Sequence, residues 1–417
     1  ELSGAGTLNK AKVSADLNTG ITISESSGIM TLTLDATAPV LIADGKTLSG
    51  SVLINSDGTL KLTQTGTLAS TVTLDGGTLD IDENLTSSGA YSLSSDSVVD
   101  VANSKTLNYS GTGLTLGART LTLSGAGSLA NGNTLTLDNA NSVLKITGTN
   151  TVSGAVAFNA GKLDIDGTST ISGALTLGGN GEIDVANTKT FNYTSTAVSL
   201  GARKLTLSGA GTVTTTNAFK LNNASSQLEI SGTGTLNKAM VSENLNTGIT
   251  ISESSTITTL TLGATAPVLI AEGKSLSGSV LINSGGILKL TKTGTVASTV
   301  TLNGGNLDID ESLTSSGAYT HSVDSTIDVA SGKTLTYSGA AMALGARTLT
   351  LTGAGTLTNT NALTLDNANS VFKVTGTNTV SGPVVLKSGK MDIDESSTLS
   401  GEVTLEGDSS INLESGK

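Results

Sequence analysis

The sequence predicts an all-β protein, a single-stack parallel β-solenoid of about 20 coils with 19–23 residues per coil. Three observations predict it. The composition favours strands and turns, with 51 Gly, three Pro, no Trp and only 2% aromatic residues. Long blocks of sequence recur at fixed offsets. Pairs of apolar residues, separated by one residue, recur about every twenty positions along the whole chain.

The composition also excludes several classes of protein. The net charge of −12 argues against a nucleic-acid partner, because nucleic acids are polyanions. The lack of Cys excludes disulfides and thiolate metal sites. The longest apolar run, residues 266–271, is far shorter than the ~20 residues that span a bilayer, so we expect no membrane span. No charged and apolar leader begins the chain, which we interpret as a mature protein or an excised piece.

Repeats occur at two long offsets. The string TLNKAKVSADLNTGITISESS at Thr7 returns almost unchanged at Thr235, an offset of 228, which defines repeat units 1–228 and 229–417, the second incomplete. The string DVANSKTLNY at Asp100 returns at Asp184, an offset of 84, and again at Asp328. In a solenoid each offset must be a whole number of coils, which gives a coil of about 20 or 21 residues. We expect residues 1–417 to form one continuous solenoid.

Apolar pairs that mark this coil form a first ladder of rungs. Residues two apart in a strand share one face, so both members of each pair point inward. The rungs are Ile21/Ile23, Val40/Ile42, Leu60/Leu62, Leu79/Ile81, Val99/Val101, Leu121/Leu123, Leu144/Ile146, Leu163/Ile165, Ile183/Val185, Leu205/Leu207, Leu228/Ile230, Ile249/Ile251, Val268/Ile270, Leu288/Leu290, Leu307/Ile309, Ile327/Val329, Leu349/Leu351, Phe372/Val374, Met391/Ile393 and Ile411/Leu413.

Two further columns indicate a triangular cross-section. A second ladder includes Leu32/Leu34, Val52/Ile54 and Val72/Leu74. A third, single-residue column includes Leu48 and Leu68, and a small residue such as Gly50 often follows two positions later, where the chain would turn a corner. One coil cannot bury its own apolar residues, so each coil depends on the coils stacked above and below it.

The outward residues between the first-ladder pairs form a charged column. Lys61 and Asp80 are expected to be neighbours on successive coils, and the pairs Lys145/Asp164, Lys289/Asp308 and Lys373/Asp392 repeat the arrangement. Stacked carboxylates of this column are candidate calcium ligands, although a solvated acidic face neutralised by lysine is the simpler interpretation. The calcium candidates are Asp80, Asp82, Asp100, Asp164, Asp166, Asp184, Asp308, Asp310 and Asp328, and no other cofactor is predicted.

The outward column of the second ladder is nearly uncharged and rich in Thr. Only Lys12 and Lys220 carry charge in it. A flat uncharged stripe is a candidate lateral contact surface, because its desolvation costs little; alternatively, Thr is present only because it favours strands. The candidate contact residues are Thr33, Leu53, Thr73, Thr136, Thr176, Thr261, Leu281, Thr301 and Thr364.

Catalysis is not expected. The only histidine, His321, stands where the matching copy has Leu93, so we interpret it as a tolerated substitution or local defect. The Asp-x-Asp units resemble the paired acids of glycosidases, but they recur with the repeat and no unique cleft is indicated. The three arginines, Arg119, Arg203 and Arg347, recur in LGAR segments, which we interpret as corners of the longer coils.

The strings LTLSGAGTL, TVSGAVAFNAGKLDIDGTSTISGALTLGGNGEIDV and TLDGGTLDID resemble the passenger repeats of bacterial autotransporter and filamentous-haemagglutinin-like adhesins. The resemblance covers the whole chain and is one of composition and period. It implies a right-handed β-helix that is exported across a Gram-negative envelope and displayed as a stalk or fibre. Neither the membrane translocator nor the secretion domain of those families is recognisable in the sequence.

The expected function is therefore that of a structural or adhesive rod of an extracellular or bacterial cell-surface fibre. The expected partners are further copies of the chain, added end to end or laterally, and a host or neighbouring-cell surface. Glu1 starts a 228-residue unit and Lys417, which matches Lys189, ends one mid-unit. We therefore expect the native chain to continue or its copies to stack, and a 41.3 kDa monomer in native mass spectrometry would contradict both.

Two other functions fit parts of the pattern. Thr-x-Thr pairs such as Thr31/Thr33 and Thr71/Thr73 resemble the flat arrays of ice-binding solenoids, with interruptions at Leu53, Ala157 and Met240. A glycan-binding or glycan-cleaving spike of the phage-tail kind is the other alternative. Thermal hysteresis would identify the first, and depolymerisation of a polysaccharide the second.

Overall fold

The computed structural model describes residues 1–414 and shows a parallel β-solenoid of about 19 turns, in which the described residues contain no helix. The fold class predicted from the sequence is confirmed. The chain forms two compact units: unit 1 comprises residues 1–198 and 209–217, and unit 2 comprises residues 199–208 and those from 218 onward. The continuity of residues 1–417 as one domain and the right-handed sense of the coil stay predictions.

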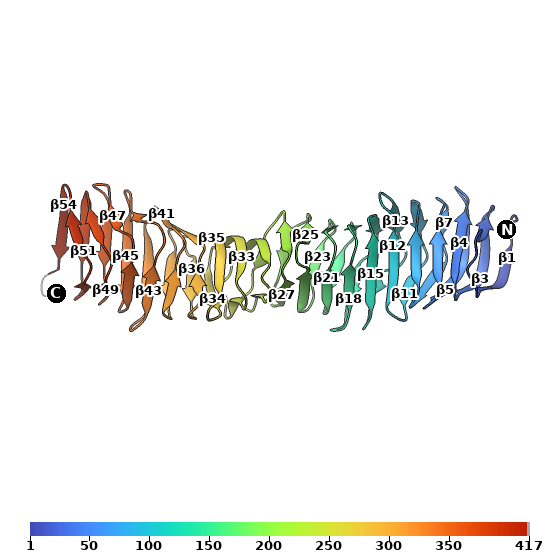
Figure 1. Cartoon of the computed structure of the whole chain (residues 1–417), viewed down its shortest axis with the longest axis horizontal. Helices are drawn as coiled ribbons and strands as arrows, with labels where there is room; N and C mark the ends of the chain where they lie inside the picture. The colour runs from blue at the N-terminus through green and yellow to red at the C-terminus, as the bar shows by residue number, and fades with distance from the viewer. Residues whose placement is uncertain (415–417) are drawn as a thin grey trace. The chain divides into compact units, whose positions relative to one another are not determined.

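Each turn carries three inward-facing strand segments. One turn of unit 1 contains β9 (Thr78–Ile81), β10 (Leu85–Ser87) and β11 (Tyr91–Leu93), in which buried residues alternate with more exposed ones. We call the face that contains β9 the first face, the face that contains β10 the third face, and the face that contains β11 the second face. Each strand pairs in parallel with the equivalent strand of the next turn, and Figure 1 shows β12, β15, β18 and β21 of the first face side by side in unit 1.

The first face holds one strand from every turn. In unit 1 these are β2 (Ile21–Ile23), β4 (Thr37–Ile42), β6 (Thr59–Leu62), β9 (Thr78–Ile81), β12 (Ser97–Val101), β15 (Thr120–Gly125), β18 (Val143–Ile146), β21 (Lys162–Ile165) and β24 (Gly181–Val185). In unit 2 they are β27 (Lys204–Gly209), β30 (Gln227–Ile230), β32 (Gly248–Ile251), β34 (Thr265–Ile270), β36 (Ile287–Leu290), β39 (Asn306–Ile309), β42 (Ser325–Val329), β45 (Thr348–Gly353), β48 (Val371–Val374), β51 (Gly389–Ile393) and β54 (Ser409–Leu413).

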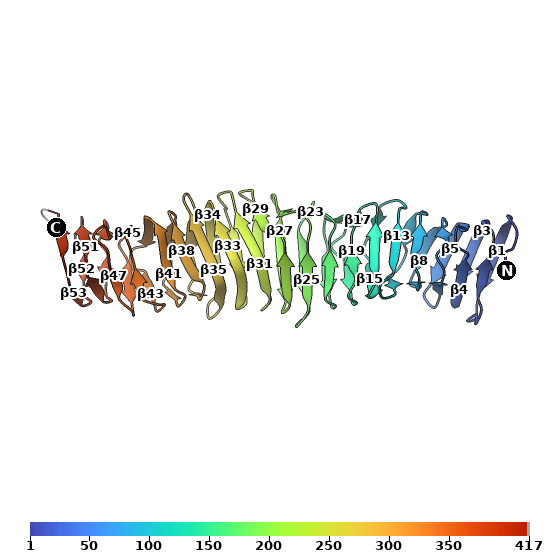
Figure 2. The ribbon, with the colours of Figure 1, turned by 90° about the horizontal axis from the view of Figure 1, so that it is seen from above.

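The second face holds strands of variable length, and its longest strands also cover the third face of their turns. In unit 1 the strands of the second face are β1 (Thr7–Val13), β3 (Ser27–Leu34), β5 (Thr47–Asn55), β8 (Thr71–Asp75), β11 (Tyr91–Leu93), β14 (Leu114–Thr115), β17 (Leu135–Leu137), β20 (Val156–Phe158) and β23 (Leu175–Leu177). In unit 2 they are β29 (Phe219–Leu221), β31 (Thr235–Val241), β33 (Ser255–Leu262), β35 (Ser275–Asn283), β38 (Thr299–Asn303), β41 (Tyr319–Val323), β44 (Met342–Ala343), β47 (Leu363–Leu365), β50 (Val384–Leu386) and β53 (Val403–Leu405). Figure 2 shows β31, β33 and β35 side by side.

The third face holds short strands. They are β7 (Thr67–Leu68), β10 (Leu85–Ser87), β13 (Thr106–Tyr109), β16 (Ser128–Asn131), β19 (Thr151–Val152), β22 (Ser169–Ile171), β25 (Thr190–Tyr193) and β28 (Thr212–Thr215) in unit 1, and β37 (Thr295–Val296), β40 (Leu313–Ser315), β43 (Thr334–Tyr337), β46 (Thr356–Asn359), β49 (Thr379–Val380) and β52 (Thr398–Leu399) in unit 2. The remaining strand, β26 (Val198–Ser199), lies at the boundary of the two units.

The core is an aliphatic column in the predicted register. Leu60 pairs with Leu79, and Leu79 pairs with Val99 on the next turn. These side chains are 0%, 0% and 3% exposed. Burying an aliphatic side chain stabilises the fold by about 1.5–3 kcal/mol before the ordering of the chain is counted. The interior of the solenoid therefore consists of such stacked apolar columns, in which the side chains of each turn are covered by those of the next turn.

Within the two units, the predicted register is wrong at four turns, each time by two residues. Val40 pairs with Leu62 rather than Leu60, and Val99 pairs with Leu123, 24 positions later, rather than with Leu121. The same shifts occur in unit 2, where Val268 pairs with Leu290 and Ile327 with Leu351. A shift of two residues keeps every side chain on its own face, so the apolar pattern cannot distinguish the two registers. The turns between the strands decide between them.

Small residues turn the chain between the third and second faces, as predicted. Gly50 lies in the middle of β5 with φ at +110°, a conformation that suits glycine. A side chain at Gly50 would lie 1.9 Å from the carbonyl oxygen of Ile29 on the preceding turn. At this corner the backbones of successive turns therefore approach too closely for a Cβ atom.

Candidate functional site

The charged column of the first face is a series of lysines held between carboxylates. Lys61 Nζ lies 2.7 Å from the carboxylate oxygens of both Asp80 and Asp82. Lys289 Nζ lies 2.8 Å from Asp308 and 2.7 Å from Asp310 in the second repeat. The inner carboxylates are about half-buried, because each has a further turn above it. The predicted pairs Lys61/Asp80, Lys145/Asp164 and Lys289/Asp308 are confirmed.

The fourth predicted pair, Lys373 with Asp392, is confirmed as neighbours on successive turns but not as an ion pair. The two residues are paired in register, but Lys373 Nζ binds Asp394 at 2.8 Å, whereas Asp392 binds Lys390 at 3.0 Å. Lys390 precedes Asp392 by two residues and reaches it along the same strand. The exchange shows that any lysine near an Asp-x-Asp unit can neutralise it.

Burial and ion pairing act in opposite directions on these groups. Burial raises the pKa of Asp80, and the hydrogen bond from Lys61 opposes that shift. The same two causes act on Asp308, whose pKa is also raised. Hydrogen bonds to Asp308 and Asp310 raise the pKa of Lys289. Each lysine of this charged column therefore holds its positive charge between the two carboxylates that it contacts.

The calcium candidates stack as the sequence predicts, since Asp80 pairs with Asp100, Asp164 with Asp184 and Asp308 with Asp328. Among residues 1–414, however, no three Asp, Glu or His residues converge in a group suited to a metal ion. Each stack already has a hydrogen-bond donor. Ser124 donates to Asp100, Lys162 to Asp184 at 2.6 Å, and Thr352 to Asp328. Calcium binding by these carboxylates stays a prediction.

The candidate lateral residues of the second face lie in continuous columns. All nine predicted residues align in register with the predicted neighbours. The columns are Lys12–Thr33–Leu53–Thr73–Ser92 and Thr115–Thr136–Ala157–Thr176 in unit 1, and Lys220–Met240–Thr261–Leu281–Thr301–Thr320 and Ala343–Thr364–Val385–Thr404 in unit 2.

A second outward column, which contains the first threonine of the Thr-x-Thr pairs, runs beside the first, and its lysines were not predicted. Lys10 pairs with Thr31 and Lys238 with Thr259, so the first Thr-x-Thr pair of each repeat adjoins a turn that carries lysine. Lys12 of the predicted column binds Asp35 at 2.7 Å. The next rungs carry Ser and Leu, as at Leu53, so the Thr-x-Thr pairs fall on alternate turns. The column is visible in the sequence once the strands are known to extend past their apolar pairs.

Two interruptions of the second face are called joint 1 and joint 2, and the pattern recurs at β23, where Tyr193 Oη accepts the Leu175 N–H at 3.1 Å. Joint 1 lies between β11 and β14, and joint 2 lies between β41 and β44; among residues 1–414 no strand pairing bridges either. In each joint a tyrosine hydroxyl accepts the backbone N–H that a paired strand would otherwise bind. Tyr109 Oη accepts the Tyr91 N–H at 3.1 Å, and Tyr337 Oη accepts the Tyr319 N–H at 3.1 Å. The sequence signal was the tyrosine that ends each TLNY-type strand, which the periodicity alone did not explain.

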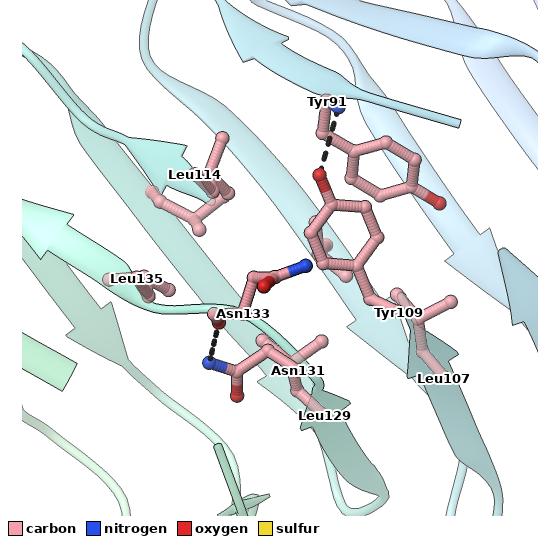
Figure 3. Close-up of a pocket in the computed structure, with 10 residues that line it drawn as sticks. Tyr91, Leu107, Tyr109, Leu114, Leu129, Asn131, Asn133 and Leu135 are labelled. Atoms are coloured by element: carbon pink, nitrogen blue, oxygen red, sulfur yellow. Dashed lines mark hydrogen bonds between the residues drawn. The ribbon is translucent and has the colours of Figure 1, made fainter. Parts of the chain in front are cut away.

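Joint 1 encloses a small apolar cavity, shown in Figure 3. Its volume is about 20 Å³, room for about one water molecule. Tyr109 points its hydroxyl at the backbone of Tyr91 across the cavity, while Leu114 and Leu135 close the facing side. Asn131 binds the carbonyl of Asn133 at 2.9 Å along its edge.

Joint 2 contains the only histidine. His321 is 9% exposed and pairs with Leu302, and neither of its ring nitrogens has a hydrogen-bond partner. Burial lowers the pKa of His321 to about 4, and the charge of Arg347 acts in the same direction. The register shifts beyond Leu302, and Val323 becomes 47% exposed. His321 is thus a neutral core residue at physiological pH.

The LGAR arginines lie at corners, as expected. Arg119 Nε donates to the carbonyl of Ser94 at 2.7 Å, and Arg347 Nε donates to that of Ser322 at 2.6 Å. Arg203 occupies the equivalent turn of the third copy. Arg119 and Arg347 thus join their corners to the preceding turn.

These features define the chain as a repetitive parallel β-solenoid with one ion-paired face and one nearly uncharged face. No protein-family model matches the sequence, and neither the curated proteins nor the solved structures provide a match. The described residues contain no helix of the length and apolarity needed to cross a membrane.

Proposed function

We propose that the chain is a structural or adhesive element of an extracellular or cell-surface fibre, and that copies associate through the second face. The difference between the two faces supports this proposal. Lysines and carboxylates of the first face are already paired, as in the Lys61 group. The second face instead presents columns such as Thr33–Leu53–Thr73, in which the outward side chains are uncharged.

The physical argument concerns desolvation. Bringing two charged faces together removes water from ions, which costs several kcal/mol per ion unless new pairs form. Threonine methyl groups and Leu53 or Leu281 lose little on desolvation and gain apolar contact. The strands are also in register over several turns, so two copies can repeat one small contact many times. A weak contact of this kind becomes strong through repetition.

The test is association of the purified chain in sedimentation velocity and negative-stain electron microscopy. Thr73→Lys and Thr301→Lys place a charge in the second-face column of each unit. Thr250→Lys, an outward residue of the first face beside Glu229, is the matched control. We expect concentration-dependent assemblies from the native chain and from the control, and their loss in the two second-face variants.

Two outcomes contradict the proposal. A native chain that stays monomeric at every concentration removes the need for a contact face. Equal loss of assembly in Thr250→Lys shows that added charge acts without regard to the face. Circular dichroism before the assay identifies any variant that has failed to fold.

A further inference from the structure

A surface hollow lies at the corner of unit 2 next to joint 2. Its volume is about 620 Å³, within the range of small-molecule sites. Its lining combines a cation, a carboxylate, hydroxyl groups and an exposed apolar side chain. The lining residues are Ser284, Gly304, Ser322, Val323, Asp324, Ala346 and Arg347.

Arg347 is held in place but keeps donors for a ligand. Its Nε binds the carbonyl of Ser322 at 2.6 Å, which orients the planar guanidinium. Among residues 1–414 this is the single hydrogen bond of the Arg347 side chain, which forms no ion pair there. Asp324, on the same hollow, accepts the Thr348 N–H through Oδ1 at 2.7 Å, which leaves Oδ2 for another donor. The guanidinium therefore offers paired N–H groups of the kind that bind a carboxylate.

The equivalent corner of unit 1 is built differently, at an offset of 228 residues. There Asp57 and Asp75 stand where unit 2 has Gly285 and Asn303. Ser95 stands in place of Val323 and donates to Asp75 at 2.7 Å. Unit 2 has thus lost two carboxylates and a hydroxyl from this corner and gained an exposed apolar group. Both changes favour an anionic ligand that also has an apolar side.

We propose that this hollow binds a sugar acid, a polyhydroxylated ring that carries one carboxylate. Arg347 pairs with the carboxylate, Asp324 and the hydroxyls of Ser284 and Ser322 bind the ring hydroxyls, and Val323 contacts the C–H face of the ring. This ligand site goes beyond the proposed fibre role and does not depend on it. The hollow is open to solvent, so a single site binds in the millimolar range.

The test is ligand-observed saturation-transfer NMR on the full chain with D-glucuronate as the probe. D-glucose, which lacks the carboxylate, and acetate, which lacks the ring, are the comparison ligands. We expect both to bind about tenfold more weakly than glucuronate or worse. Equal binding of glucose overturns the role of Arg347, and equal binding of acetate reduces the site to a simple anion site. No transfer from glucuronate at tens of millimolar, the weak limit for such sites, overturns the proposal.

Matched variants locate the site. Arg347→Gln should weaken glucuronate binding about tenfold or more, while Arg119→Gln at the unit 1 corner should leave it unchanged. The triple variant Gly285→Asp, Asn303→Asp, Val323→Ser gives unit 2 the residues with which unit 1 folds, and it should lose binding as well. Unchanged binding in the triple variant contradicts the proposal even if Arg347→Gln fails to fold.

The single histidine provides a readout that does not depend on the ligand signal. Arg347 contributes to the lowered pKa of His321, so a carboxylate bound to Arg347 should raise that pKa. The His321 ring protons give one resolved pair of NMR signals, because the chain has one histidine. An unchanged titration curve with saturating glucuronate would place the ligand elsewhere.

Discussion

Joint 1 and joint 2 are built from the same sequence pattern, yet they differ in how well their interiors are packed. Joint 1 has Leu93 in its core column, in register with Leu74, and encloses a small cavity. Joint 2 has His321 at the same position, with two unpaired ring nitrogens and a shifted strand. A tyrosine hydroxyl caps the strand edge in both joints. The edge is therefore maintained in both copies, whereas the packing behind it differs.

This difference indicates that a solenoid tolerates a poorly packed core residue, such as His321, where its ladder of paired strands is already interrupted. Within a continuous ladder, an imidazole without partners would lie between two paired turns. At joint 2 the strand beyond His321 is free to shift, and Val323 turns outward. Stability in such folds is a sum over neighbouring turns, so one weak joint lowers local stability without unfolding distant turns.

The largest expected effect is an acid-dependent loss of stability at joint 2. His321 has a pKa of about 4 when folded against an ordinary value of 6.5, so the unfolded state binds the proton more readily. Stability from this group is complete above pH 6.5 and is lost as pH falls toward 4, by at most about 3 kcal/mol. Hydrogen exchange of β41 and β44 at pH 7 and pH 4.5 measures the change. Equal protection factors, after correction for intrinsic exchange, would contradict the assignment.

Exchange of the two core residues should move the defect from one joint to the other. His321→Leu should stabilise joint 2 by about 2–3 kcal/mol and remove its pH dependence, because a buried polar group without partners is replaced by an apolar one. Leu93→His should destabilise joint 1 by a similar amount. Chemical denaturation monitored by hydrogen exchange of each joint measures both. A loss of stability in His321→Leu would show that the imidazole makes contacts that the leucine cannot replace.

Filling the cavity should bring joint 1 closer to the packing of joint 2. Unit 2 has Ile327 and Met342 where unit 1 has Val99 and Leu114. The double variant Val99→Ile, Leu114→Met should stabilise joint 1 by about 1 kcal/mol, since it buries roughly one more methylene in existing space. The reverse variant, Ile327→Val with Met342→Leu, serves as the control and should destabilise joint 2. Destabilisation by the filling variant would indicate overpacking.

The lysine groups of the first face should respond identically in the two units. Lys61→Met and Lys289→Met each remove the cation between two carboxylates and should each cost about 0.5–1 kcal/mol at low salt and less at high salt. Thermal unfolding at two ionic strengths measures this. Unequal costs would show that the first face also differs between the units.

Calcium provides a further check on these groups. Because lysine occupies each carboxylate pair, we expect calcium chloride to leave the melting temperature of the native chain unchanged relative to magnesium chloride. A rise specific to calcium would confirm the calcium sites predicted from the stacked aspartates.

The smallest expected effect concerns one turn that appears three times. Ser104 and Thr188 have φ values of 62° and 65°, while Gly332 occupies the same position with φ at 70°. Side chains other than glycine are strained there, so Thr188→Gly should stabilise unit 1 by about 0.5 kcal/mol after the greater freedom of unfolded glycine is counted. Gly332→Thr should lower the stability of unit 2 by a similar amount. Thermal unfolding of the two variants measures the change in stability of each. A change in the same direction in both variants would exclude backbone strain as the cause.

Much of this arrangement followed from the sequence alone. Alternation of apolar residues with a period of two determines which side chains point inward, and the spacing of about twenty determines which residues stack. Leu60, Leu79 and Val99 were therefore placed correctly without coordinates, as were the Lys61/Asp80 pair and the Thr33–Leu53–Thr73 column. These are local properties, because each depends on one strand and its neighbour on the next turn.

Only the tertiary structure decided the register at four turns, the two joints and the hollow beside Arg347. A shift of two residues leaves the inward pattern unchanged, so Val99 could pair with Leu121 or Leu123 until the turns were built. The joints depend on a tyrosine hydroxyl reaching a backbone N–H of another turn, and the hollow depends on side chains that changed on three separate turns. Such features depend on contacts between residues of different turns once the coil has closed in three dimensions. The spacing of apolar residues along the sequence does not specify these contacts.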